Sequence, residues 1–211
     1  MVSRGRKDDS LKRRAPSRDP KRRILVVCEG QVTEREYILK FRQAVRNQRV
    51  HVEVAREHGV PLTVVKEAQR LRDEAAGEAK SQGDQNLRYD EVWAVYDTDD
   101  HPNLKAARQH AERQDIKLAI SNPCFELWAL LHFQDQRASI HRDKARAKLQ
   151  AHMPDYDKSL TFAPLSPKEA AYAEAVHRAM ALDAAAEEHG SPGRNPTTRV
   201  YLLTESIRSD A

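Results

Sequence analysis

Short apolar runs and longer stretches of helical periodicity alternate along the first 120 residues. The apolar runs predict buried strands, which cover 23–28, 50–55, 91–96 and 116–120. Between them, apolar residues recur every three or four positions and predict helices over 34–46, 61–81 and 104–114. Because helical crossovers between neighbouring parallel strands are right-handed, this order predicts an α/β fold with a four-stranded, mostly parallel sheet flanked by helices.

The second half of the chain shows helical patterns without further strands. Predicted helices cover 125–133, 138–151, 168–188 and 199–207. The segment from Asn195 to Thr198 reads as a turn that caps the last helix, and 154–167 reads as irregular. The pattern predicts a core over 22–137 and a helical C-terminal extension over 138–211 that packs on the core.

Glu29 and Gly30 end the first apolar run and begin the turn into the first helix. Gly30 permits a tight turn at this point. Thr33 is a favourable N-cap residue, and Glu36 stands three positions later, which is the spacing of a capping box. Strand, turn and helix together form half of a βαβ unit, with Glu29 at the carboxyl end of the strand.

Positive charge is concentrated at the N-terminus. The net charge of the 211 residues is +4, but residues 1–23 hold ten Lys and Arg against three Asp. Residues 1–21 also lack apolar periodicity, which predicts a basic, disordered tail. Two interpretations stay open, a solubilising leader or an arm that follows the phosphates of a nucleic acid.

Several classes of protein are disfavoured by the sequence. No apolar run approaches the roughly 18 residues of a membrane span, and the polar N-terminus does not resemble a secretory signal. Cys28 and Cys124 lie in apolar sequence without metal-thiolate spacing, which suits a reducing cytoplasm. The chain has no Gly-x-x-x-x-Gly-Lys or Gly-x-Gly-x-x-Gly motif, so ATP chemistry of the P-loop type would have to come from another subunit.

Carboxylates follow two of the predicted strands. Glu29 comes after the first strand, and Asp97 and Asp99 come after the third. An isolated Asp-x-Asp is most simply a solvated loop or a helix cap. Ligands of open α/β sheets, however, bind beyond the carboxyl ends of the strands, where these acids would meet. Converging carboxylates repel each other unless a hard cation lies among them, so the pattern predicts a Mg²⁺ or Mn²⁺ site.

Four segments carry a resemblance to a known family. They are Ile-Leu-Val-Val-Cys-Glu-Gly-Gln-Val-Thr at 24–33, Tyr-Asp-Thr-Asp-Asp at 96–100, Ala-Ile-Ser-Asn-Pro-Cys-Phe-Glu-Leu-Trp-Ala-Leu-Leu-His-Phe at 119–133 and Asn-Pro-Thr-Thr at 195–198. Together they resemble the RloB family over roughly residues 22–207. The Ser-Asn-Pro-Cys-Phe-Glu block is the most specific part.

The resemblance implies a Toprim-like fold in which Glu29, Asp97 and Asp99 are the catalytic, metal-binding acids. Glu29 would serve either as a metal ligand or as a general acid and base. Such proteins are encoded in bacterial restriction and anti-phage loci, often beside an AAA/ABC-type ATPase partner. The resemblance therefore implies a Mg²⁺-dependent nuclease.

Further candidates surround these acids. Glu126 follows the fourth strand, either as a fourth metal ligand or as a carboxylate that stabilises a helix N-terminus. His101 belongs to a turn or contacts phosphate or metal, and His132 fits a core or rim position. Cationic side chains are candidates for a phosphate-binding rim or for solvated helix faces, namely Arg35, Lys105 and Arg108.

The leading hypothesis is a cytoplasmic, metal-dependent nuclease of DNA or RNA. It would act as the effector of an anti-phage or abortive-infection system and be controlled by a partner ATPase. The alternative is a non-catalytic Toprim-like scaffold that binds nucleic acid or regulates the ATPase. Whether the substrate is DNA, tRNA or another RNA, and whether the protein forms a homo-oligomer, is left open by the sequence.

Overall fold

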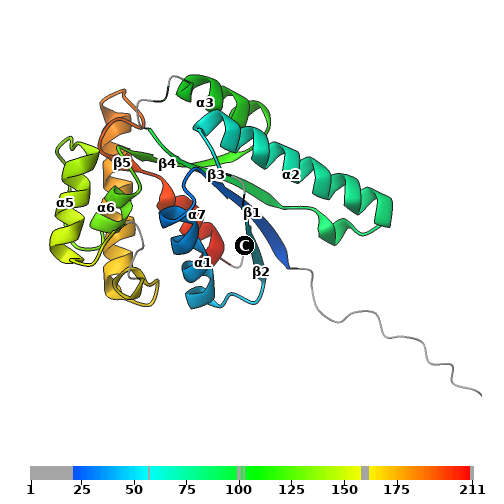
Figure 1. Ribbon diagram of the computed structural model, residues 1–211, viewed down its shortest axis with the longest axis horizontal. Helices are drawn as coiled ribbons and strands as arrows, with labels where there is room; N and C mark the ends of the chain where they lie inside the picture. The colour runs from blue at the N-terminus through cyan, green and yellow to red at the C-terminus, as the bar shows by residue number, and fades with distance from the viewer. Residues whose placement is uncertain (1–20, 57, 99–100, 102, 158–161, 210–211) are drawn as a thin grey trace, which may run out of the picture.

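One mixed sheet forms the centre of the protein in the computed structural model, which describes residues 21–56, 58–98, 101, 103–157 and 162–209. Its strand order is β2-β1-β3-β4-β5 (Figure 1). The strands are β1 (Arg22–Cys28), β2 (Val50–Val54), β3 (Glu91–Asp97), β4 (Lys117–Asn122) and β5 (Thr197–Thr198). The first four are parallel, and β5 pairs antiparallel with β4. The four predicted strands and their mostly parallel arrangement are confirmed.

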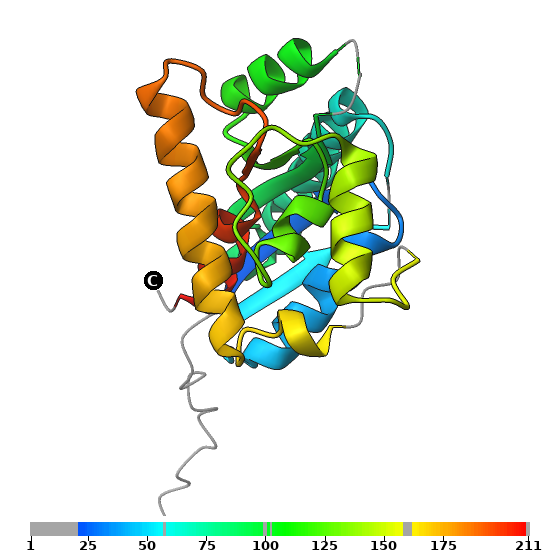
Figure 2. The ribbon, with the colours of Figure 1, turned by 90° about the vertical axis from the view of Figure 1, so that its left-hand side faces the viewer.

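Helices cover both faces of the sheet (Figure 1). The α-helices are α1 (Thr33–Val45), α2 (Pro61–Gln82), α3 (Leu104–Arg113), α4 (Glu126–Leu130), α5 (Arg142–His152), α6 (Ala170–Glu188) and α7 (Val200–Arg208). Two 3₁₀ turns, η1 (Gln85–Leu87) and η2 (Ala163–Leu165), complete the elements of the described part. Figure 2 shows α5 and α6 on the same flank of the molecule, where both contact α4.

The alternating side chains of β1 feed two separate cores. Ile24, Val26 and Cys28 belong to a core with residues of α1, α4, α6 and α7. Leu25 and Val27 belong to a second core with residues of α2 and α3. Because successive side chains of a strand point to opposite faces, a segment buried on both faces must be apolar throughout, as β1 is from Ile24 to Cys28.

Three local predictions are corrected by the structure. The segment from Asn195 to Thr198, predicted as a turn and cap, contains a fifth strand. Helix α1 begins at Thr33 itself, and its N-cap is Val32 without a side-chain cap hydrogen bond, so the capping-box prediction is wrong. Helix α5 begins at Arg142 rather than 138. The predicted boundary near 137 stays a prediction, although the first core draws side chains from both sides of it.

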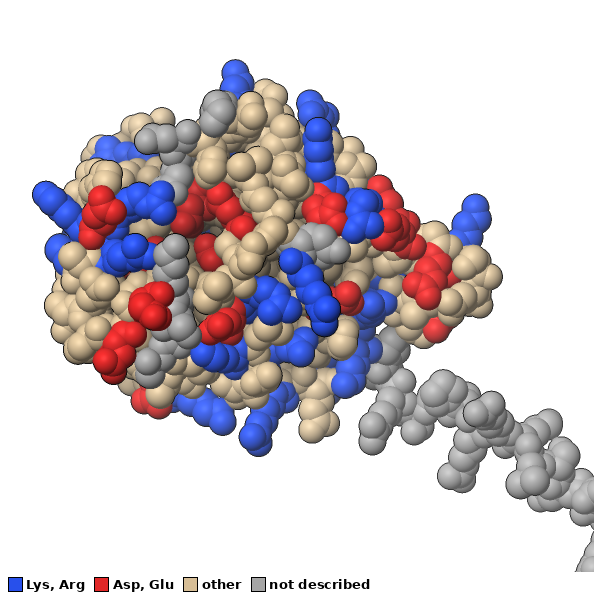
Figure 3. Space-filling view, in the orientation of Figure 1, with Lys and Arg blue, Asp and Glu red and all other residues tan. Residues whose placement is uncertain are grey.

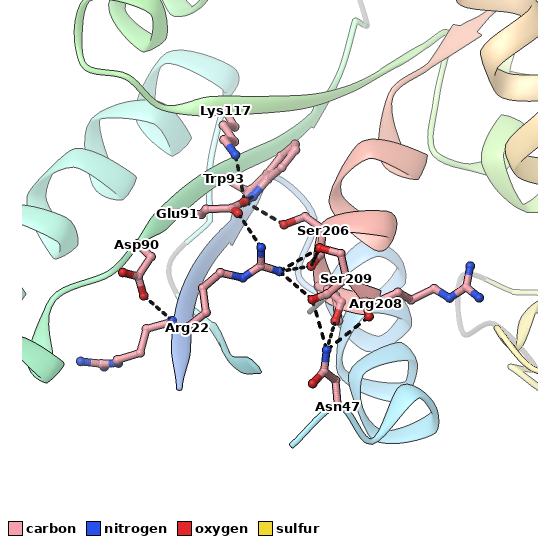
Figure 4. Close-up of polar contacts among 11 residues, drawn as sticks. Arg22, Asn47, Asp90, Glu91, Trp93, Lys117, Ser206, Arg208 and Ser209 are labelled. Carbon is pink, nitrogen blue, oxygen red and sulfur yellow. Dashed lines mark hydrogen bonds and ion pairs between the residues drawn. The ribbon is translucent and has the colours of Figure 1, made fainter. Parts of the chain in front are cut away.

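The amino edge of the sheet is tied to the C-terminal helix around Glu91 (Figure 4). The Glu91 carboxylate accepts hydrogen bonds from the Trp93 indole and the Ser206 hydroxyl, both at 2.8 Å. It also pairs with Arg22 at 3.3 Å and with Lys117 at 3.1 Å. Burial alone would raise the pKa of Glu91, but these partners hold that pKa below its ordinary value.

Arg22 and Asn47 satisfy carbonyl groups at the end of α7. The Arg22 guanidinium donates to the carbonyl oxygens of Ser206 and Ser209. The Asn47 side chain donates to those of Ile207, Arg208 and Ser209 (Figure 4). The last carbonyls of a helix have no intrahelical partners, so Arg22 anchors α7 to β1 and Asn47 anchors it to the loop between α1 and β2.

The sequence also led to predictions about the basic tail, about membrane spans and about the two cysteines. Residues 1–20, which make up nearly all of the predicted basic tail, lie outside the described residues. Within the described ranges, no helix combines the length and apolar character needed to cross a membrane. Cys28 and Cys124 are both free and buried.

Candidate active site

Glu29 and Asp97 meet at the carboxyl end of the central strands. Cys28 pairs with Val95 in the parallel ladder, and the Glu29 backbone N–H donates to the Val95 carbonyl at 2.8 Å. The Glu29 carboxylate in turn accepts a hydrogen bond from the Asp97 backbone N–H at 2.9 Å. The register of β1 and β3 therefore brings together two acids that are far apart in the sequence.

The Asp97 carboxyl group lies among three other carboxylates. Burial raises the pKa of Asp97 well above its usual range, and the charges of Glu34, Glu126 and Glu29 raise it further. A hydrogen bond from the Phe125 backbone N–H acts in the opposite direction. Four acids, from the residue after β1 and from α1, β3 and α4, thus come to the same edge of the sheet.

Glu34 is the site acid that the sequence prediction missed. Its side chain is 8% exposed, in the first turn of α1. Its carboxylate lies directly over Gly30, and a Cβ atom at Gly30 would overlap it. The sequence signal for Glu34 is a Gly and a Glu four residues apart, directly after a strand that ends in an acid. The pattern alone could not tell whether Glu34 faces the sheet edge or solvent.

Glu126 opens α4 and is held by residues from the later part of the chain. The Tyr156 hydroxyl donates to Glu126 Oε1 at 2.8 Å, and Arg146 Nε of α5 lies 3.8 Å from the same oxygen. Burial, followed by the charge of Glu126, raises the pKa of Tyr156 far above its ordinary value, so the phenol stays a donor. Tyr156 was not predicted as a site residue.

His101 contacts the acidic site directly. Its Nε2 atom lies 2.8 Å from Glu29 Oε1, so both Glu29 oxygens have partners in the structure. The structure places His101 beside the acids, and a contact with phosphate or metal stays a prediction. His132 lies elsewhere: it is buried in the core, stacked edge-on against Trp128 with ring centroids 4.9 Å apart.

The three predicted phosphate-binding cations are spread around the site. Arg35 Nε donates to the Ala55 carbonyl at 3.4 Å, next to the end of β2. Lys105 and Arg108 are exposed on α3. The Arg108 guanidinium packs over Gly193 in the loop that precedes β5. Figure 3 shows acidic side chains gathered above α1, with Lys and Arg side chains over α5 beside them.

The four carboxylates are the kind of group that binds a divalent cation, but their positions do not form a metal site. Carboxylate oxygens are the ligands that Mg²⁺ and Mn²⁺ prefer, and four clustered acids need a compensating charge. Among the residues that the structure describes, however, no group of three or more His, Cys, Asp or Glu side chains is positioned to hold a metal ion. Asp99, predicted as a ligand, lies outside the described residues. The residues available to hold a cation are Glu29, Glu34, Asp97 and Glu126.

The fold and site define an α/β protein with an acidic site at the carboxyl end of its parallel strands. The family model described as RloB-like protein matches residues 24–207, which is most of the chain. The chain therefore belongs to the RloB-like family. Neither the curated proteins nor the solved structures contain a match to it.

Proposed function

We propose that this protein is a metal-dependent nuclease that hydrolyses phosphodiester bonds of DNA or RNA. The observation that carries the proposal is the grouping of Glu29, Glu34 and Glu126 around Asp97. Carboxylates in this number at the carboxyl end of parallel strands suit a site for Mg²⁺ or Mn²⁺. The Toprim-like comparison made from the sequence agrees with this use of the acids.

Each side chain has a separate task in this proposal. Asp97 and Glu126 hold the cation, together with Asp99, and Glu34 supplies a further carboxylate. A bound cation would supply Lewis-acid polarisation of the scissile phosphate and a more acidic bound water. His101 lies within hydrogen-bond distance of Glu29, so that the pair can pass a proton to or from the reacting oxygens. Glu29 is a metal ligand or a general acid and base.

The biological setting is proposed from family membership. RloB-like membership suits an effector of a bacterial anti-phage or abortive-infection system that acts in the cytoplasm. Because the chain has no P-loop motif, an ATPase partner of the AAA/ABC type would supply any dependence on ATP. A homo-oligomer is compatible with the proposal.

One observation favours the non-catalytic alternative. Both oxygens of Glu29 are already engaged, one by the Asp97 backbone and one by His101. A scaffold that binds nucleic acid or regulates the ATPase would use the acids as this structural network. The nuclease remains the preferred proposal, because mutual repulsion among the acids around Asp97 is costly without a cation.

Cleavage assays with matched variants separate the two functions. The full chain, with and without its partner ATPase, is incubated with DNA and with total RNA in Mg²⁺, Mn²⁺ or EDTA. We expect cleavage that EDTA abolishes and that Glu29→Gln lowers at least a hundredfold. Glu36→Gln is the matched control, because Glu36 lies on α1 and pairs with Lys40 at 3.3 Å. Absence of cleavage under every condition would rule out the nuclease proposal, and equal cleavage by both variants would rule out Glu29 as part of its active site.

A further inference from the structure

A polar cavity opens beside the acidic site. It has a volume of about 420 Å³, and its wall includes Thr98, His101, Asn122 and Asn195 together with the N-terminal residues of α5. His101 belongs both to this wall and to the acidic site, through its contact with Glu29. Thr98 directly follows Asp97, and Asn122 ends the strand that leads to Glu126. The same loops therefore line the cavity and carry the acids.

The cavity wall carries basic side chains, whereas the acidic site carries carboxylates. His101, His141 and Arg142 supply two imidazoles and a guanidinium. No carboxylate belongs to the described lining, although His101 contacts Glu29 at 2.8 Å and His141 contacts Asp143 at 3.3 Å. Pro123 and Ile140, both buried, form an apolar floor. A guanidinium with imidazoles suits a phosphate, and an apolar surface suits a sugar or base.

Asn195 fixes the position of the segment that carries His141 and Arg142. Its amide accepts a hydrogen bond from the Ile140 N–H at 2.9 Å and donates to the Ile140 carbonyl at 2.8 Å. This paired contact holds the residue that precedes His141 and Arg142, although the two segments are far apart in the sequence. On the opposite side, Asn122 donates to the Gly193 carbonyl at 2.9 Å. The wall is thus built by defined contacts between three loops.

We propose that this cavity binds one unpaired nucleotide of the nucleic-acid strand, adjacent to the scissile phosphate. The inference rests on the proposed nuclease function and names its substrate subsite. The nucleotide phosphate contacts Arg142 and His141, and its sugar or base packs on Pro123 and Ile140. The volume is at the small end of the roughly 300–1,000 Å³ range of ligand sites, so it admits one nucleotide and excludes a duplex.

Mononucleotide binding tests the cavity without any cleavage step. The full chain is titrated in EDTA with a nucleoside 5′-monophosphate and, separately, with inorganic phosphate, and dissociation constants are measured by calorimetry. We expect Arg142→Ala to weaken mononucleotide binding about tenfold or more, since a charge-assisted contact to phosphate is lost. Lys144→Ala removes the same charge from an exposed position of α5 outside the cavity wall and should change binding less than about twofold.

Each result decides a separate question. Equal binding by Arg142→Ala and Lys144→Ala would overturn the proposal, as would inorganic phosphate binding as tightly as the mononucleotide. Binding through Arg142 in a protein that cleaves no nucleic acid would refute the nuclease while leaving a nucleotide-binding cavity. Cleavage without mononucleotide binding would refute the cavity alone.

Discussion

The carboxylate of Glu29 accepts a hydrogen bond from the backbone N–H of Asp97 at 2.9 Å. This contact joins the ends of β1 and β3 and holds the first acid against the strand that carries the second. It also means that Glu29 contributes to the local structure as well as to the charge of the site. Substitutions at the acidic site therefore have to be compared for both stability and activity.

Replacing Asp97 should separate stability from function. Asp97→Asn removes the charge that lies among Glu29, Glu34 and Glu126. We expect the melting temperature in EDTA to rise by a few degrees, corresponding to about 1 kcal/mol, while cleavage is lost. Mg²⁺ or Mn²⁺ should raise the melting temperature of the unsubstituted protein and leave that of Asp97→Asn nearly unchanged. A lower melting temperature for the variant in EDTA would contradict the repulsion argument.

Gly30 should be indispensable for the position of Glu34. In Gly30→Ala the new Cβ atom overlaps the Glu34 carboxylate, so either the side chain moves or the turn distorts. We expect a loss of about 1–3 kcal/mol in the free energy of unfolding, measured by urea denaturation, together with weaker cleavage.

The double variant Gly30→Ala/Glu34→Ala provides the control for this overlap. It removes the carboxylate that the new methyl group meets, and so should recover part of the stability without recovering cleavage. If the two substitutions were simply additive in stability, the close approach of Glu34 to Gly30 would not be the cause.

His132 should make the fold sensitive to mild acid. Burial lowers the pKa of His132 to about 4, against an ordinary value of 6.5. Between these values the unfolded chain binds more protons, so stability is complete above about pH 6.5 and falls with decreasing pH. At pH 5 the contribution is a loss of about 2 kcal/mol relative to pH 7.

Urea denaturation at pH 7 and pH 5 measures the effect of His132. His132→Gln should be destabilised at pH 7, because it loses packing against Trp128, but should lack this part of the pH dependence. His189→Gln is the control, since His189 is exposed at the end of α6. An identical loss between pH 7 and pH 5 in all three proteins would exclude His132 as the cause.

Glu91 should matter for the attachment of α7. Its carboxylate accepts hydrogen bonds from Trp93 and Ser206 and pairs with Arg22 and Lys117. Glu91→Gln should lower the free energy of unfolding at pH 7 by about 1–3 kcal/mol, because it weakens contacts to a largely buried charge. Since the folded pKa of Glu91 is depressed, this contribution exists above its ordinary value of 4.5 and disappears as the pH falls below it.

The matched control for Glu91 is again Glu36→Gln, whose ion pair with Lys40 on α1 is more exposed than the contacts of Glu91. That variant should stay within about 0.5 kcal/mol of the unsubstituted protein. Hydrogen exchange should show faster opening of α7 in Glu91→Gln, while exchange in α2 stays unchanged. Uniform destabilisation of both helices would mean that Glu91 stabilises the whole sheet rather than the C-terminal helix.

Most of the α/β frame could be predicted because each central strand is locally distinct. The run from Ile24 to Cys28 is apolar on both faces and ends at Glu29, so neither its type nor its end needed tertiary information. By contrast, β5 has only two residues and exists because it pairs with Ser121 and Asn122 of β4. No local pattern encodes such a pairing.

The sequence by itself determined that Glu29 and Asp97 lie at the ends of strands of one parallel sheet, because apolar runs and their ends are local properties. Only the tertiary structure decided which other groups reach them. Glu34 depends on the rotation of α1, and Tyr156 reaches Glu126 from a segment 30 residues away. These contacts arise from the packing of helices and loops against the sheet, where the direction of a side chain depends on neighbours that are remote in the chain.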